Sequence, residues 1–203
     1  MENGGIFDLL TNWPIIVLFI LAGFVWARLR TQRVKEGVDK VWSRVAANTG
    51  LEYTNHSVHG TFQGCDLRMT VQGPVFSGIV TRREENSTRI QIRTWNVTGA
   101  TLTLQKINAL YPQRMGAIWF GDESFDNKVV VQASSGEFAT AVLSPLLRER
   151  FFQLLARRPS IRVTLTQQGE LTYLQKGVEE DVLYLKWTFE FLANLAAAIE
   201  RFV

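Results

Sequence analysis

A run of apolar residues near the start of the chain is the first pattern to interpret. Residues 13–29 read WPIIVLFILAGFVWARL, with one charge, Arg28, near the end. A helix of this length covers about 25 Å, at the short end of what a bilayer requires. Trp13 and Trp26 lie near its two ends, where interfacial aromatic residues are common. The pattern predicts an N-terminal transmembrane helix. The alternative, a cleaved signal peptide, needs positive charge before the run, whereas Glu2 and Asp8 precede it.

The charges that follow this run predict its orientation. Basic residues that flank a span favour the cytoplasmic side. Residues 1–12 would then be a short extracytoplasmic N-terminus, and the rest of the chain would lie in the cytoplasm. Basic side chains close to an anionic leaflet also attract it, so we expect this group to contact the lipid surface. Its members are Arg28, Arg30, Arg33 and Lys35.

Helical periodicity continues directly after the basic group. Apolar residues such as Val34, Val38, Trp42 and Val45 recur at helical spacing, and Gly50 follows at a position typical of a helix end. We interpret residues 30–50 as a juxtamembrane basic helix.

Alternating apolar positions then predict strands. Residues 51–107 contain several alternating stretches separated by glycine turns, and residues 128–133 form another strand. Short connections between neighbouring strands favour antiparallel pairing. Residues 137–156 read as two short helices, the second beginning at Ser144 and Pro145, and a hairpin follows with its turn at Gly169.

The C-terminal segment, residues 179–203, predicts a long amphipathic helix. Leu185, Phe189 and Leu192 belong to its main apolar stripe. The charge-free run from 191 to 199 is too short for a second span. Trp187, Phe191 and Leu195 widen the apolar surface. Two interpretations follow: these residues pack against the domain core alone, or they also contact a partner or the bilayer.

Composition limits the remaining possibilities. After subtraction of the anchor, 203 residues leave room for one domain, at 51–203, and 46% hydrophobic residues indicate a folded one. The net charge is only +3, and the single cysteine, Cys65, excludes an internal disulfide. The predicted fold class is α+β: an N-terminal transmembrane helix followed by one domain of antiparallel β-sheet packed with several helices.

Candidate chemical groups each have a structural interpretation. His56, His59 and Cys65 are metal-ligand types, but a three-residue spacing on a strand separates the two imidazoles. The acids of residues 121–126 lack calcium-loop spacing and read as a turn. No catalytic triad or phosphate loop is recognisable. We therefore predict no catalytic residue, no metal and no cofactor.

A basic and aromatic strand face raises the question of nucleic acid. Arg89, Gln91, Arg93 and Trp95 alternate with Ile90 and Ile92. Such faces occur in single-strand binding platforms, but a solvated face of a half-buried strand has the same pattern. We expect the solvated face and no nucleic-acid partner.

Two elements resemble an uncharacterised group of bacterial membrane-anchored proteins. The first is GDESFDNKVVVQA at residues 121–133, and the second is LSPLLRERFFQL at 143–154. That group has G-D-x-x-F-D before a strand and L-T-P-x-L-R before a helix. Ser144 here replaces the usual threonine, and Asn127 and Lys128 lie where arginines are common. The resemblance implies a bacterial origin and an α+β domain, and it assigns no activity.

A strong apolar segment without recognisable chemistry favours a non-enzymatic role. We expect an accessory or scaffold subunit at the bacterial inner membrane, single-pass with its N-terminus outside, whose partners are the bilayer and subunits of a larger membrane complex. The alternative is a membrane-tethered small-ligand or lipid sensor with a pocket between the terminal helix and the sheet. A hydrolase is the third interpretation, and it would need a cleft with a perturbed acid or histidine.

Overall fold

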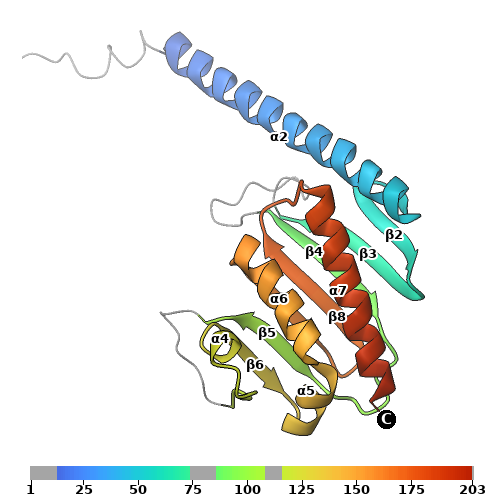
Figure 1. Cartoon of the computed structure of the whole chain (residues 1–203). Coiled ribbons are helices and arrows are strands. Elements are labelled where there is room, and N and C mark those ends of the chain that lie inside the picture. The colour runs from blue at the N-terminus through green and yellow to red at the C-terminus, as the bar shows by residue number, and fades with distance from the viewer. Residues whose placement is uncertain (1–12, 74–85, 108–115, 203) are drawn as a thin grey trace, which may run out of the picture. The chain divides into compact units, whose positions relative to one another are not determined.

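The computed structural model describes residues 13–73, 86–107 and 116–202 (Figure 1). It divides into two compact units, residues 1–37 and residues 38–203. The first helix, α2, runs from Trp13 to Thr49 and contributes to both units. Side chains of α2 are described for residues 16–26 and from residue 36 onward.

The predicted N-terminal transmembrane helix is contradicted. Within the described residues, the apolar part of α2 is limited to Ile16–Trp26, which is shorter than the roughly 20 residues of a span. The described helix that is long and apolar enough to cross a membrane is instead α7, Val182–Arg201, at the C-terminal end. Over half of its apolar window, 56%, is buried inside the protein. Apolar composition alone does not separate a membrane span from a buried helix, and α7 passes the same test of length and composition while more than half of its apolar window is buried.

One antiparallel eight-stranded sheet organises the domain, which confirms the α+β expectation for this part of the chain. The strand order is β1-β2-β3-β4-β8-β7-β5-β6. The strands are β1 (Glu52–Thr54), β2 (Ser57–Phe62), β3 (Cys65–Gln72), β4 (Ser87–Arg93), β5 (Leu102–Lys106), β6 (Val129–Ala133), β7 (Ile161–Leu165) and β8 (Glu170–Lys176). The N-terminal four strands meet the C-terminal four where β4 pairs with β8, with Ile90 opposite Tyr173.

Helices α5, α6 and α7 lie on one face of this sheet (Figure 1). The helices after the first strands are α4 (Glu123–Asp126), α5 (Gly136–Val142), α6 (Pro145–Arg157) and α7 (Val182–Arg201). Their starts follow local rules: the side chains of Ser135, Ser144 and Asp181 each accept a hydrogen bond from a backbone N–H of the first turn. The predicted pair of short helices is therefore confirmed, with Ser144 and Pro145 at the start of the second.

The core lies between the helices and the sheet. Side chains of β4 alternate strictly, and Ile90 and Ile92 are fully buried on the inner face. Phe151 of α6 and Phe189 of α7 are also fully buried. The last part of α2 belongs to the same core, because Trp42 is 0% exposed. The other face of the sheet carries mostly polar side chains that are half-buried or exposed, as expected when only one face is covered.

Candidate functional site

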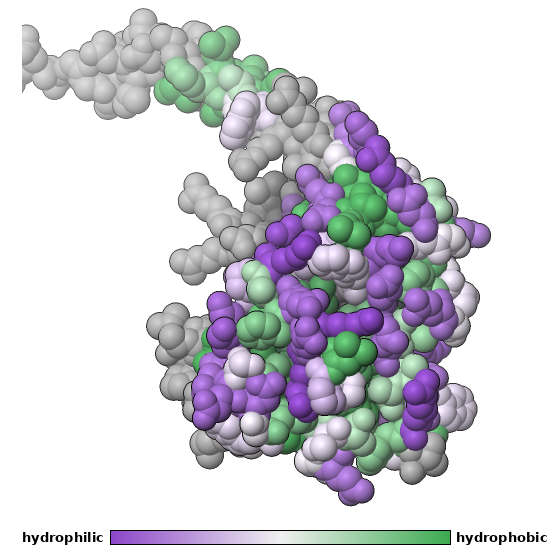
Figure 2. All heavy atoms as spheres, viewed as in Figure 1, coloured by the Kyte–Doolittle hydropathy of each residue, from purple (hydrophilic) through white to green (hydrophobic). Residues whose placement is uncertain are grey.

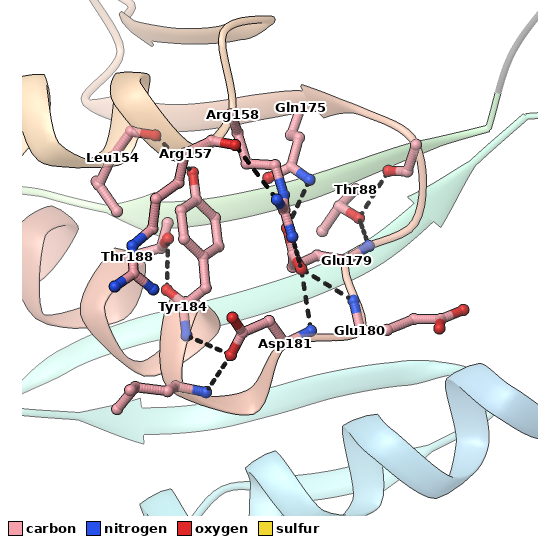
Figure 3. Close-up of polar contacts among 12 residues, drawn as sticks. Thr88, Leu154, Arg157, Arg158, Gln175, Glu179, Glu180, Asp181, Tyr184 and Thr188 are labelled. Carbon is pink, nitrogen blue, oxygen red and sulfur yellow. Dashed lines mark hydrogen bonds and ion pairs between the residues drawn. The ribbon is translucent and has the colours of Figure 1, made fainter.

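A buried carboxylate lies where β8 leads into α7. The Glu179 side chain is 1% exposed and accepts hydrogen bonds from two side chains (Figure 3). The guanidinium of Arg158 donates through Nε at 2.7 Å and through Nη2 at 2.9 Å, so it binds both carboxylate oxygens. The Gln175 amide donates to Oε2 at 2.8 Å.

Backbone groups complete this cluster. The N–H groups of Glu180 and Asp181 donate to Oε1 of Glu179 at 3.1 and 2.9 Å. The Glu179 N–H donates to Oγ1 of Thr88 at 2.8 Å, and its carbonyl accepts from Nε1 of Trp42 at 3.0 Å. One residue thereby joins α2, β4, β8, α7 and the end of α6.

The electrostatics of Glu179 favour the ionised form. Burial raises the pKa of its carboxyl, but the hydrogen bonds from Arg158, Gln175 and the Asp181 backbone outweigh burial and lower it. The same partner raises the pKa of the Arg158 guanidinium, because the hydrogen bond to Glu179 stabilises the cation. Both carboxylate oxygens are occupied by donors, so this group is not poised as a general base. We interpret the cluster as structural.

Two tyrosines extend the cluster into the core. The hydroxyl groups of Tyr173 and Tyr184 are 2.9 Å apart, and Tyr173 donates to Gln175 at 2.8 Å. Burial raises the pKa of Tyr184 to about 12 and that of Tyr173 well above its usual value. Both hydroxyls therefore stay neutral at physiological pH and act as hydrogen-bonding groups.

A second polar group lies at the turn between β1 and β2. Nδ1 of His56 is 2.6 Å from Oδ1 of Asp39, and the Tyr53 hydroxyl donates to the same oxygen. Burial and this hydrogen bond raise the pKa of Tyr53 far above its usual value. An open hollow of about 600 Å³ adjoins the turn. It is lined by Thr54, Asn55, His56, Ser57, His59, Arg68, Thr70 and Val71.

The structure brings two of the three candidate metal ligands to the same hollow and places the third elsewhere. His56 and His59 line the same hollow, but His56 lies in the turn and His59 on β2. Cys65 is half-buried at the start of β3, and it is not among the residues lining that hollow. In the described ranges no three His, Cys, Asp or Glu side chains are grouped closely enough to hold a metal ion.

The acids of residues 121–126 form a capped turn. The Asp122 side chain accepts from the Ser124 hydroxyl at 2.6 Å and from the N–H groups of Ser124 and Phe125, and these bonds lower the pKa of its carboxyl. Asp126 is 7% exposed, and its carboxylate accepts from the N–H groups of Phe120 and Asp122. The carboxylates of Asp122 and Asp126 thus stabilise the loop in which they lie.

The basic strand residues lie on the open face of the sheet. Arg89, Gln91 and Arg93 alternate outward on β4. Glu170 of β8 is 3.6 Å from Arg89 and accepts from Gln91 at 2.7 Å, so part of the positive charge is neutralised. Trp95 lies beyond the end of β4 and is 76% exposed.

The expected interaction residues have different environments. The side chains of Arg28, Arg30, Arg33 and Lys35 lie outside those described. On α7, Trp187 is half-buried and packs under the guanidinium of Arg157 at 4.3 Å. Phe191 is 1% and Leu195 0% exposed, since both pack in the core rather than at the surface. A surface for a partner on α7 would therefore depend on Trp187.

An exposed apolar segment is the other feature with functional meaning. Within the described side chains of α2, large apolar residues are exposed over Ile16–Trp26, and Figure 2 shows apolar residues on the visible face of this segment. The most exposed are Leu18, Phe19, Ile20, Phe24 and Trp26, each at 65% or more. A helix that is apolar all round is stable only when something apolar surrounds it.

Sequence reasoning missed the Glu179 cluster. It used Glu179 only as one of several acids at a helix start, and it did not single out Arg158 or Gln175. A signal existed for Gln175, which occupies an inward position of β8 in register with buried Tyr173. A polar residue on the buried side of a strand requires a partner.

The fold defines an α+β domain with one antiparallel sheet and its helices on one face. No protein-family model matches the chain, and no curated protein matches it. Among solved structures, the domain is similar to the crystal structure of the mycobacterial trehalose monomycolate transport factor A, TtfA. The TM-score is 0.52 at 10% sequence identity, over 80% of this chain and 94% of that chain. At this identity the likeness concerns the fold.

Proposed function

We propose that the protein is a non-enzymatic accessory factor that associates with a membrane and assists a larger membrane complex. The exposed apolar segment Ile16–Trp26 carries this proposal. Side chains such as Phe19, at 72%, and Phe24, at 67%, are too exposed for a segment that remains in water. Exposed apolar patches of this kind mark contact with lipid or with other proteins.

The polar chemistry of the domain supports a non-enzymatic role. The buried carboxylate of Glu179 has hydrogen-bond donors on both oxygens. The buried tyrosines Tyr173 and Tyr184 hydrogen-bond each other and remain neutral. The similar structure, TtfA, is described as a transport factor, which supports an accessory role for this chain.

The basic residues after the apolar segment favour the cytoplasmic surface of a bacterial inner membrane. Arg28, Arg30, Arg33 and Lys35 follow the apolar segment within a few residues. Each basic residue near an anionic leaflet contributes about 1 kcal/mol of attraction. The proposed partners are accordingly the bilayer and neighbouring subunits, with no nucleic acid.

Substitution of charge into the apolar segment tests the membrane association. The double variant Phe19→Lys and Phe24→Lys should move the chain from the membrane fraction into the soluble fraction. Leu146→Lys with Leu183→Lys is the matched control, because these residues are 59% and 52% exposed on the domain. The control should remain in the membrane fraction. Equal fractionation of both variants would contradict the proposal.

Purification in mild detergent tests the accessory role. Cross-linking followed by mass spectrometry of the wild-type chain should recover the same membrane-protein partners repeatedly, in a fixed ratio. A lone monodisperse monomer, with no partner after cross-linking in cells, would count against an accessory subunit. A membrane-bound but partnerless chain would favour the ligand-sensing alternative instead.

The structure gives weaker support to the alternative function, a ligand sensor. It expected a pocket between the terminal helix and the sheet. In that region Phe189 and Leu192 of α7 and Ile90 of β4 are all 0% exposed, so packed side chains fill the space. Lipid extraction of the purified chain, followed by mass spectrometry, would test this alternative directly.

A further inference from the structure

We propose that the hollow beside the β1–β2 turn binds a phosphate group. This inference is independent of the proposed function. The hollow has a volume of about 600 Å³ and contains both histidines of the chain together with Arg68. Thr70 adds a hydroxyl group to its lining, as does Ser57, whose hydroxyl donates to the Thr54 carbonyl at 2.9 Å. These are the side-chain types that donate hydrogen bonds to phosphate oxygens.

The strand register brings four of these side chains together. His59 of β2 lies directly opposite Arg68 of β3, and Ser57 lies directly opposite Thr70. Directly opposed residues have Cβ atoms about 5 Å apart, and the two pairs are two residues apart along the strands. All four side chains therefore belong to one patch about the size of a phosphate group on the open face of the sheet.

The guanidinium of Arg68, which lines the hollow, favours an anion over a metal cation. Arg68 is exposed, and within the described residues it makes no hydrogen bond or ion pair. The described side chains that line the hollow include no carboxylate. A guanidinium can bind two oxygens of a phosphate at once, whereas it repels a cation.

Carboxylates behind the histidines orient the rings. Asp39 contacts Nδ1 of His56 at 2.6 Å, and Glu52 lies 3.5 Å from Nε2 of His59. A carboxylate only accepts hydrogen bonds, so Nδ1 of His56 carries the hydrogen in this contact, and Nε2 donates to a phosphate oxygen only when the ring carries a second hydrogen. Neither acid lines the hollow, so each can orient an imidazole without occupying the ligand's place.

The turn itself supports a role for His56 beyond folding. Asn55 and His56 have φ values of 49° and 57°, the left-handed conformation of a two-residue hairpin turn. Glycine is favoured at the second position, because a side chain there costs about 1 kcal/mol. The chain nevertheless has a histidine at that position, adjoining a hollow lined with other donors.

Nuclear magnetic resonance titration tests the proposal on the full chain in detergent. Inorganic phosphate and glycerol 3-phosphate are the soluble probes, with chloride at equal ionic strength as the reference. Saturable shifts of the His56, His59 and Arg68 signals are expected with phosphate and not with chloride. Vesicles of phosphatidylcholine with and without phosphatidic acid distinguish a lipid headgroup from a free phosphate as the source.

Three variants make the test specific. Arg68→Gln should weaken phosphate binding at least tenfold. His56→Gly should also weaken it while keeping the hairpin, because glycine adopts this φ without strain. The matched control is Arg162→Gln, an exposed arginine on the same sheet face that donates to Gln105, and it should bind as the wild type does.

Three results would overturn the proposal. These are the absence of saturable shifts with either soluble probe, equal binding by the Arg68→Gln variant and the wild type, and preferential binding of Zn²⁺ at the same histidines. Failure of membrane association in the fractionation experiment would leave this result unaffected, so the two proposals can fail separately.

Discussion

The guanidinium of Arg158 binds both carboxylate oxygens of Glu179, with Nε 2.7 Å from Oε2 and Nη2 2.9 Å from Oε1. The arginine side chain is 41% exposed and the glutamate 1% exposed. The pair therefore lies at the boundary between solvent and core. Loss of the arginine leaves a buried carboxylate without its cationic partner. Loss of the glutamate leaves a cation that water can reach.

This asymmetry predicts different costs for the two partners. Arg158→Ala should lower the free energy of unfolding by about 3 to 5 kcal/mol, because a buried charge loses its ion partner. Glu179→Gln should cost about 1 to 3 kcal/mol, since one amide oxygen still accepts backbone hydrogen bonds. Urea unfolding followed by circular dichroism measures both. Equal costs would show that burial of Glu179 is not the decisive factor.

The lowered pKa of Glu179 predicts acid sensitivity. A carboxyl whose folded-state pKa lies below its unfolded value of about 4.3 adds stability above that value. This stability is lost as the pH falls through the folded-state pKa. The free energy of unfolding, measured by urea titration from pH 7 to pH 3, should therefore converge between the wild type and Glu179→Gln at the acid end. A constant difference across this range would contradict the assignment.

Trp42 should contribute through its indole N–H as well as through packing. Its Nε1 donates to the Glu179 carbonyl at 3.0 Å, and the side chain is 0% exposed. Trp42→Phe should lower the free energy of unfolding by about 2 to 4 kcal/mol, because it leaves a smaller ring and an unpaired carbonyl. Trp95→Phe is the control, since that ring is 76% exposed. The control should change stability by less than about 0.5 kcal/mol.

Two glycines with the same backbone conformation offer a matched comparison. Gly169 has φ 78°, and a Cβ there would clash with the Thr94 carbonyl oxygen. Gly64 has φ 83° and open space at the same position. Gly64→Ala should lower the free energy of unfolding by about 1 kcal/mol, the cost of placing an alanine in the left-handed conformation. Gly169→Ala should lower it clearly more, because the clash adds to this cost. Thermal unfolding of both variants would detect the difference, and equal shifts would exclude the close contact as its cause.

The loop before β6 should respond to its buried acid and not to calcium. Asp126 accepts hydrogen bonds from the N–H groups of Phe120 and Asp122. Asp126→Ala should lower the free energy of unfolding by about 1 to 3 kcal/mol, because it leaves two half-buried N–H donors unpaired. Addition of millimolar Ca²⁺ should leave the melting temperature of the wild type unchanged. A calcium-dependent increase would show that these carboxylates bind metal.

Local patterns predicted the secondary structure well. The alternation of Ile90 and Ile92, the cap at Ser144 and the turn at Gly169 depend on neighbouring residues only, and the structure has each of them. The exact partners of β4 were not predictable in this way, because β8 follows it by almost eighty residues. Antiparallel pairing was expected, but the strand order was not.

Interpretation of the N-terminal apolar helix failed for a related reason. Apolar composition shows that a helix avoids water, but not what surrounds it. Leu195 of α7 is 0% exposed because the domain covers it, while Phe19 of α2 is 72% exposed. The Glu179 cluster was missed similarly, since Arg158 and Glu179 are separated by the hairpin of β7 and β8.

The junction of β4 with β8 has a consequence for synthesis. Strands β1 to β4 form sequential hairpins, so they can pair as soon as they leave the ribosome. The free edge of β4 must then wait until residues 170–176 emerge. At about 5 to 20 residues per second this delay lasts several seconds. An unpaired strand edge can pair with another nascent chain. The order of translation therefore exposes β4 to aggregation until β8 has emerged.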